Sequence, residues 1–167
     1  MTSISENTKR LIDFLSQSGV EFRVLEHGEC RSSAESSEAR SSAGAAVVGA
    51  KALVIKMEKG EFSTVVLPGT HRIDNKALKA KIGGFRFANE AEMADATGGL
   101  PRGTIPPFGP VLFSGISGLF VDDGLRSFDT IGFNASCLNQ SVIISSADYF
   151  SICQATDVFR FASLPVA

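Results

Sequence analysis

The stretch "KALVIK", residues 51–56, carries a lysine at each end of an otherwise apolar run. A short apolar run that contains valine and isoleucine is typical of a strand. Because side chains alternate between the two faces of a strand, Lys51 shares its face with Leu53 and Ile55, and Lys56 lies on the other. Lys51 either lays its stem along the core with its ammonium group in water or presents its charge to a substrate. The spacing alone leaves both interpretations open.

A second candidate is the segment "GGLPRGTIPPFGP", residues 98–110, which is rich in glycine and holds four prolines and one charged residue. Glycines allow backbone N–H groups to approach a ligand closely. Prolines fix φ and stiffen the loop, so that less conformational entropy is lost on binding. The pattern therefore predicts a ligand-contacting loop, with a structural crossover loop as the alternative. For Phe108, a pocket wall and an anchor in the core are equally compatible with the pattern.

The sequence lacks the motifs of several common chemistries. It has no G-x-G-x-x-G after a strand, no P-loop, no C-x-x-C pair and no G-x-S-x-G elbow. His27 and Cys30 form a lone H-x-x-C, and a metal site needs three or four ligands. We therefore expect neither a metal nor a cofactor. The odd number of cysteines, three, indicates a reducing compartment rather than a disulfide framework.

The composition fits one globular domain spanning residues 1–167. The net charge of -2 excludes a global basic field for long nucleic acid, so we expect no DNA partner. No apolar run approaches the ~18 residues of a membrane span, and the start of the sequence lacks the apolar core of a signal peptide. These features predict a cytoplasmic protein with no membrane partner.

The hydrophobic periods and turn residues predict the following elements. Helices are expected at 7–18, 33–43, 75–83, 90–98 and 147–156, with Asp74, Asn89 and Ser145 or Ser146 as N-terminal caps. Strands are expected at 20–27, 51–57, 62–67, 85–89, 110–114, 118–123, 127–135 and 140–146. This order predicts an α/β fold with a mixed, curved, barrel-like sheet and helices packed around it.

Four segments together, "KALVIK", "HRIDNKALKAKIG", "ATGGLPRGTIPPFG" and "FDTIGFNASCLNQSVIISSADYF", resemble the YbaK/ProX family. These proteins are free-standing relatives of the editing domain of bacterial prolyl-tRNA synthetases. The resemblance covers about 20–155 and implies that fold. It also implies a trans-editing aminoacyl-tRNA deacylase, which hydrolyses the ester of a mischarged tRNA. The implied partners are the tRNA acceptor end and, as a further candidate, an aminoacyl-tRNA synthetase.

The resemblance also implies the site residues. Its catalytic lysine falls on Lys51. Its substrate-binding positions fall on Leu25, His27, Gly103, Thr104, Ile105, Pro107, Phe108, Gly109, Asn134 and Ser141. The implied mechanism has no protein nucleophile: water attacks the ester, the ribose hydroxyl of the substrate helps to activate it, and loop N–H groups stabilise the oxyanion. A basic cluster, Arg72, Lys76, Lys79, Lys81 and Arg86, either meets the acceptor stem or forms a solvated surface.

The sequence departs from the family pattern where substrate choice is decided. Ala135 and Ser136 replace a glycine turn, and Ser141 stands where some members carry aspartate. The five positions expected around the amino-acid side chain, Leu25, Ile105, Phe108, Asn134 and Ser141, carry no charge. A charged side chain would lose water there without a partner. We therefore expect a small or medium uncharged amino acid, such as alanine, serine, threonine or cysteine.

Two other function classes compete with the deacylase. One is a non-catalytic regulatory module that binds tRNA or aminoacyl-adenosine with the same fold, which the departures at Ser141 and Ala135 permit. The other is a hydrolase of small molecules unrelated to tRNA. Deacylation of a panel of charged tRNAs separates the first from the enzyme, and salt-sensitive binding of tRNA argues against the second.

Overall fold

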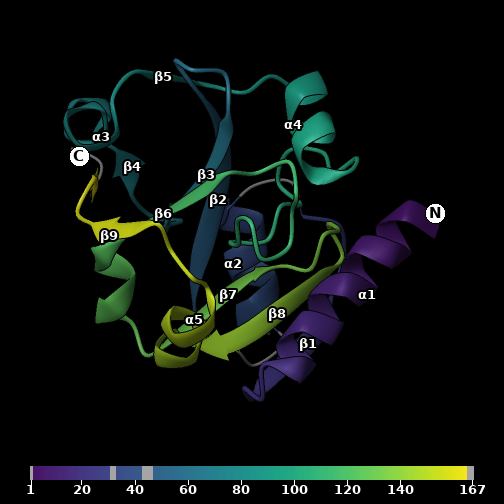
Figure 1. Cartoon of the computed structure of the whole chain (residues 1–167). Helices are drawn as coiled ribbons and strands as arrows, with labels where there is room; N and C mark the ends of the chain where they lie inside the picture. Colours follow the sequence, from purple (N-terminus) through teal and green to yellow (C-terminus); the bar gives the residue numbers. More distant parts are fainter. Residues whose placement is uncertain (1, 31–32, 43–46, 165–167) are drawn as a thin grey trace.

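The computed structural model describes residues 2–30, 33–42 and 47–164. Its centre is an eight-stranded mixed sheet in the order β1-β8-β7-β2-β3-β6-β9, with β5 paired to β2 (Figure 1). The strands of this sheet are β1 (Phe22–Glu26), β2 (Val48–Met57), β3 (Phe62–Pro68), β5 (Phe85–Phe87), β6 (Gly118–Asp122), β7 (Thr130–Asn134), β8 (Gln140–Ser145) and β9 (Asp157–Phe159). Parallel and antiparallel pairs coexist, which confirms the predicted mixed α/β fold.

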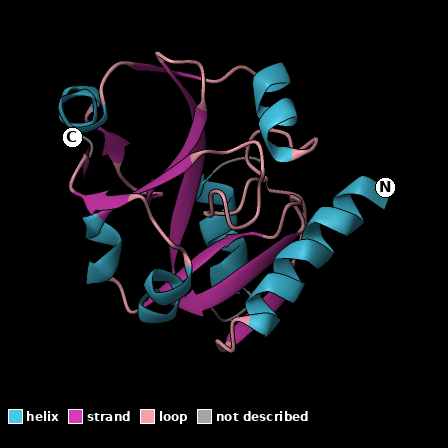
Figure 2. Ribbon diagram, viewed as in Figure 1, coloured by secondary structure: helices cyan, strands magenta, loops and turns pink. Residues whose placement is uncertain are grey.

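Helices surround this sheet (Figure 2). They are α1 (Thr2–Gln17), α2 (Ser33–Ser42), α3 (Asn75–Ile82), α4 (Glu90–Thr97), α5 (Ser146–Ile152) and a 3-10 helix, η1 (Asp123–Ser127). A separate pair of short strands, β4 (Arg72–Ile73) and β10 (Ala162–Ser163), joins the segment after β3 to the end of the chain. None of the helices over the described residues has the length and apolar character needed to cross a membrane.

Side chains at the helix N-termini fix where three helices begin, as the sequence predicts. The Asp74 carboxylate accepts from the N–H of Ala77 at 3.1 Å at the start of α3. At α4, Asn89 and Glu92 form a reciprocal capping box, with bonds of 2.9 and 3.0 Å. Ser145 caps α5 in the same way. These polar groups satisfy N–H donors that the helices cannot.

The long strand β2 separates two apolar cores. Ala50 and Val54 point into the larger core, which also holds Phe108. Leu53 and Ile55 point into the smaller core, beneath α3. The predicted alternation along "KALVIK" is therefore confirmed. It places Lys51 on the strand face that Leu53 shares.

The predicted strand at 110–114 is wrong. The N–H groups of Leu112 and Phe113 both donate to the carbonyl of Gly109 at 3.0 Å, which makes a compact turn rather than an extended strand. Both side chains are buried, so their apolar character reflects burial and not pairing in a sheet. Pro110 also lacks the N–H that a strand interior needs.

The sequence patterns predict none of the short elements β4, β9, β10 and η1. A strand of two or three residues is too short to show a period of two. The C-terminal segment is instead held by Asp122, whose buried carboxylate accepts from the N–H groups of Phe161 at 2.7 Å and Ala162 at 2.9 Å. Of the helix predicted at 33–43, the structure describes 33–42, and residue 43 lies outside the described residues.

Candidate active site

A cavity of about 640 Å³ opens between α2, the first half of β2, β7 and the glycine- and proline-rich loop. Four of the predicted site residues line it: Lys51, Gly103, Ile105 and Asn134. They come from three separate parts of the chain, brought together because β2 and β7 are neighbours in the sheet. The size lies within the range of small-molecule sites.

Lys51 is half-buried in the wall of this cavity. Its Nζ donates to the carbonyl oxygen of His71 at 3.3 Å, beside the lining residues Gly69 and Thr70. Burial lowers the pKa of Lys51, and the positive charge of Arg72 lowers it further. The ammonium group therefore lies in the cavity wall and remains partly desolvated, which strengthens its interaction with an anionic group.

Asn134 joins the end of β7 to the loop. Its Nδ2 donates to the carbonyl of Gly103, which itself has a positive φ of 86°. The Oδ1 atom of Asn134 is buried and has no hydrogen-bond partner among residues 2–30, 33–42 and 47–164. An unpaired buried acceptor is costly, so Asn134 offers a hydrogen-bond acceptor to a ligand.

Phe108 is an anchor in the core and not a pocket wall. Its ring is fully buried and packs against Phe14 and Phe133, with centroids 5.3 and 5.8 Å away. The neighbouring Pro107 carbonyl accepts a 2.6 Å hydrogen bond from the buried Tyr149 hydroxyl. These contacts fix the second half of the loop and leave its first half to face the cavity.

Three further predicted residues lie away from the cavity wall. Thr104 turns its hydroxyl to the carbonyl of Pro101 at 2.7 Å. Pro107 is buried beside Phe108, and Gly109 packs so closely that a Cβ there would lie 2.9 Å from Leu119 Cβ. These three positions support the loop and do not line the cavity.

Leu25, His27 and Ser141 form a layer behind the cavity. Leu25 and Ser141 are partners across β1 and β8. His27 Nε2 lies 2.8 Å from Ser141 Oγ, and its Nδ1 lies 2.8 Å from the carbonyl of Gly28. Ser141 is fully buried. Its effect on a ligand must therefore pass through a neighbouring residue.

That neighbour is Arg40, which the sequence analysis missed. Arg40 comes from α2, is 3% exposed, lines the cavity, and donates from Nε to Ser141 Oγ at 3.1 Å. Burial lowers its pKa to about 10, and Cys30 opposes this decrease, so Arg40 remains charged at neutral pH. A lone arginine in a helix of small polar residues gives no signal of burial in the sequence.

Residues 27–152 match the family model of the aminoacyl-tRNA editing domain. The chain belongs to this family. It is 38% identical over 163 residues to the multifunctional Ser/Thr-tRNA deacylase ProXp-y of Escherichia coli K12, covering 92% of both chains. The same identity and coverage hold for that protein from strain O157:H7. The predicted family and the predicted class of enzyme, an aminoacyl-tRNA deacylase, are both confirmed.

Solved structures show the same fold. The crystal structure of a hypothetical protein has a TM-score of 0.79 at 24% identity and covers 92% of this chain and 99% of its own. A protein described as a candidate trans-editing enzyme for prolyl-tRNA synthetase has a TM-score of 0.77 at 22% identity and covers 94% and 97%. The editing-domain architecture is therefore shared across distant sequences.

The predicted basic cluster of this editing domain is largely engaged within the protein. Arg86 Nη2 lies 2.7 Å from Glu92 Oε2, and Lys81 Nζ lies 3.7 Å from Asp157 Oδ2. Lys79 lies over the ring of Phe85. None of these residues lines the cavity. A role of the cluster in binding the acceptor stem stays a prediction.

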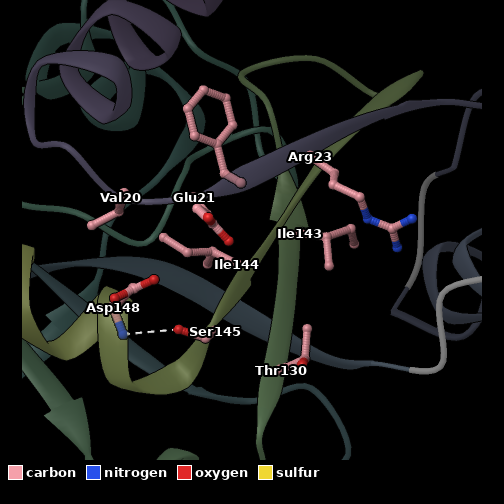
Figure 3. A pocket seen from close by; sticks show the side chains of 9 residues that line it. Val20, Glu21, Arg23, Thr130, Ile143, Ile144, Ser145 and Asp148 are labelled. Carbon is pink, nitrogen blue, oxygen red and sulfur yellow. Dashed lines mark hydrogen bonds between the residues drawn. The ribbon is translucent and has the colours of Figure 1, made fainter.

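A second hollow, of about 530 Å³, lies where β1, β7, β8 and the start of α5 meet (Figure 3). Its lining includes the carboxylates of Glu21 and Asp148, and Ser145 in it is already engaged as the cap of α5. It contains none of the predicted site residues. Its two carboxylates outnumber its one cation, Arg23, so this hollow suits an RNA phosphate less well than the first cavity, to which we assign the substrate.

Proposed function

We propose that this editing domain removes serine or threonine from mischarged tRNA by hydrolysing the aminoacyl ester, with the aminoacyl group in the cavity beside Lys51. The observation that carries the proposal is the convergence of Lys51, Gly103 and Asn134 on one cavity. The named activity of ProXp-y, which is 38% identical over 92% of both chains, supports serine and threonine as the amino acids.

Lys51 supplies positive charge at the point where the RNA end enters. Its Nζ is held by the carbonyl of His71, and Arg102, which is exposed, lines the same cavity. A point charge on a flexible stem suits a phosphate or a polarised ester oxygen. Lys51 therefore orients the terminal nucleotide and stabilises the negative charge that develops on the ester.

The loop supplies the oxyanion donors in this proposal. The N–H of Thr104 already donates to the carbonyl of Pro101 at 3.2 Å. The amides on either side, those of Gly103 and Ile105, belong to residues that line the cavity. We assign these two N–H groups to the oxygen that becomes negative when water attacks the ester carbonyl. The loop is held by its buried second half, so little reorganisation is needed.

The attack needs no nucleophile from the protein. Water adds to the ester carbonyl, and the tetrahedral intermediate collapses to a free amino acid and a ribose hydroxyl. The neighbouring ribose hydroxyl of the substrate accepts the proton from water and returns one to the leaving oxygen. Asn134 Oδ1 is buried and has no partner among the described residues. In this proposal the Asn134 side chain turns toward the cavity, and Oδ1 then accepts a hydrogen bond from the amino or hydroxyl group of the substrate.

The cavity also changes the predicted basis of selectivity. The pocket was expected to be uncharged, but Arg40, Lys51 and Arg102 line it, and none of its described lining residues is Asp or Glu. A lysyl or arginyl side chain therefore meets like charges and finds no carboxylate. Small side chains with an acceptor oxygen remain well suited.

The test is a deacylation panel with purified protein and no synthetase, because every assigned residue comes from this one chain. Seryl-, threonyl-, alanyl- and cysteinyl-tRNA are compared with aspartyl- and lysyl-tRNA at one salt concentration. We expect the fastest release for serine or threonine, and loss of release in Lys51→Ala. Binding of all these tRNAs without any hydrolysis would instead establish the non-catalytic module.

A further inference from the structure

Two glycines face each other in the sheet beneath Arg40. Gly49 of β2 and Gly132 of β7 are direct partners in the parallel pair. A Cβ at Gly132 would lie 2.9 Å from Arg40 Cδ and 3.0 Å from its Nε, and a Cβ at Gly49 would lie 3.2 Å from Nη1. Neither glycine has the positive φ that would itself require glycine. Their small size therefore makes the slot in which the Arg40 side chain lies.

The slot places a charged guanidinium in the inner wall of the cavity. Only the Nε of Arg40 is used by Ser141, while Nη1 lies over Gly49, which lines the cavity as Arg40 does. None of the described lining residues supplies a carboxylate. Keeping a buried charge costs free energy unless partners compensate it. A ligand oxygen in the cavity is such a partner.

The position of the slot identifies the part of the substrate that reaches it. Gly49 precedes Lys51 by two residues on the same strand face, which is about 7 Å along a strand. The exposed residue Arg102 marks the mouth, whereas Arg40, which is 3% exposed, lies at the buried end of the cavity. With the ester held at Lys51 and the RNA outside, the group that extends inward is the amino-acid side chain.

We propose that Arg40 donates a hydrogen bond to the side-chain oxygen of the aminoacyl group and thereby selects serine and threonine over alanine. This inference rests on the proposed function and names the residue that determines its specificity. The same guanidinium repels an ammonium group of similar size. Arg40 thus favours serine and opposes an isostere of serine that carries an ammonium group in place of the hydroxyl. This opposite response of two substrates of similar size gives the inference a distinctive test.

The experiment uses one tRNA acylated with serine, alanine or 2,3-diaminopropionic acid, in which an ammonium group replaces the serine hydroxyl. Arg40→Met keeps an unbranched side chain as far as the position of Nε, which is the part that lies over Gly132, and removes the guanidinium with its donors and its charge. We expect the ratio of kcat/KM for serine to that for alanine to fall about 10- to 100-fold, the range for a hydrogen bond to a charged group. We expect release of diaminopropionic acid to increase.

A purely structural role gives a different result. Damage to the cavity lowers kcat/KM for all three substrates by the same factor, and that outcome would overturn the inference, as would an unchanged ratio of serine to alanine. Arg102→Met is the matched control. It removes another cation from the same cavity, but at the exposed mouth, so the ratio of serine to alanine should stay the same.

Gly132→Ala tests the inference if Arg40→Met does not fold. It retains the arginine but moves it, because the new Cβ lies within 3.0 Å of Arg40 Nε. The ratio of serine to alanine should fall, and Gly49→Ala should lower it less. An unchanged ratio in a folded Gly132→Ala contradicts the inference. If the wild-type protein releases none of the amino acids, the proposed function is wrong. If it releases serine, but the ratio of serine to alanine does not depend on Arg40, only the inference is wrong.

Discussion

The hydroxyl of Ser141 and the imidazole of His27 are joined by a 2.8 Å hydrogen bond between β8 and the segment after β1. The Nδ1 of His27 faces the carbonyl of Gly28 at 2.8 Å. Because a carbonyl only accepts, Nδ1 carries the proton in the neutral ring, and Nε2 accepts from Ser141. Ser141 Oγ in turn accepts from Arg40 Nε. The hydrogen bonds therefore run in one direction, from Arg40 to Gly28.

The first prediction is that Ser141→Ala destabilises the fold and weakens the preference for serine. The substitution leaves the buried Arg40 Nε without its acceptor, which costs about 1–3 kcal/mol. Chemical denaturation measures the loss of unfolding free energy. The ratio of deacylation rates for serine and alanine shows whether the guanidinium of Arg40, no longer held by Ser141, still selects serine. Ser151→Ala, at an exposed serine that bonds its own helix, is the control. Equal stability of the two variants would contradict the prediction.

The second prediction concerns the two lysines of "KALVIK". Lys51→Ala should lower kcat/KM about 100-fold or more, in the range found for removal of a group that stabilises developing charge. Its melting temperature should change little, because the side chain that is removed beyond Cβ is only half-buried and carries a partly desolvated charge. Lys56→Ala removes a surface ion pair with Glu92 and should retain activity, since such pairs contribute little. Deacylation and melting are measured together, and a Lys51→Ala protein with normal turnover refutes the role.

The third prediction is a loss of activity at alkaline pH. Burial and Arg72 lower the pKa of Lys51 below 10.5, so its charge is lost at a lower pH than that of a free lysine. The enzymatic rate, after subtraction of spontaneous ester hydrolysis, should therefore decline before pH 10.5. The comparison uses alanyl-tRNA, whose side chain makes no bond to Arg40, because Arg40 itself has a pKa of about 10. With this substrate, Lys51→Arg keeps its charge and should show no such decline, whatever its absolute rate. If the rate of Lys51→Arg declines with the same midpoint pH as the wild type, the group that loses its proton is not Lys51.

The fourth prediction is that the contribution of Arg40 to the free energy of unfolding increases at alkaline pH, where activity declines. A cation with a pKa lowered by folding binds more protons in the unfolded chain, so its contribution to the free energy of unfolding rises with pH. For Arg40 this window begins at about pH 10 and extends upward toward the ordinary pKa of arginine. The difference in unfolding free energy between the wild type and Arg40→Met should therefore change across this range in favour of the wild type. A constant difference would contradict the lowered pKa.

The sequence was sufficient to predict the elements that local rules determine. The caps at Asp74 and Asn89, and the alternation that gives Lys51 its face, follow from a few neighbouring residues, and the structure confirms them. The strand predicted at 110–114 failed because Leu112 and Phe113 are buried in a turn. An apolar run indicates burial, and burial alone does not distinguish a turn from a strand.

Arg40 could not be predicted because its environment is assembled from distant segments. Its partner Ser141 lies 101 positions away, and the slot needs Gly49 and Gly132 to be aligned in two strands. The one local signal was Gly132 inside the strand predicted at 127–135, because a glycine within a strand often marks a close approach of another group. Gly49 lies before the strand predicted at 51–57. The same reasoning explains why the sequence did not show that Leu25 and Phe108 lie off the cavity wall, a correction to their expected positions that depends on the packing of distant segments.

The last prediction tests that correction at Phe108. Phe108→Ala should destabilise the protein by about 3–5 kcal/mol, because a fully buried ring in contact with Phe14 and Phe133 is removed. Phe87→Ala is the control, since that ring is 47% exposed and should contribute far less.

The milder Phe108→Leu separates an anchor from a pocket wall. It should lower the melting temperature while the deacylation ratio of serine to alanine stays at the wild-type value, because the ring does not line the cavity. A wall residue that contacts the side chain would change that ratio, since a change of one methylene in a pocket alters discrimination by about 1–3 kcal/mol. A shifted ratio with unchanged stability would therefore return Phe108 to the substrate pocket.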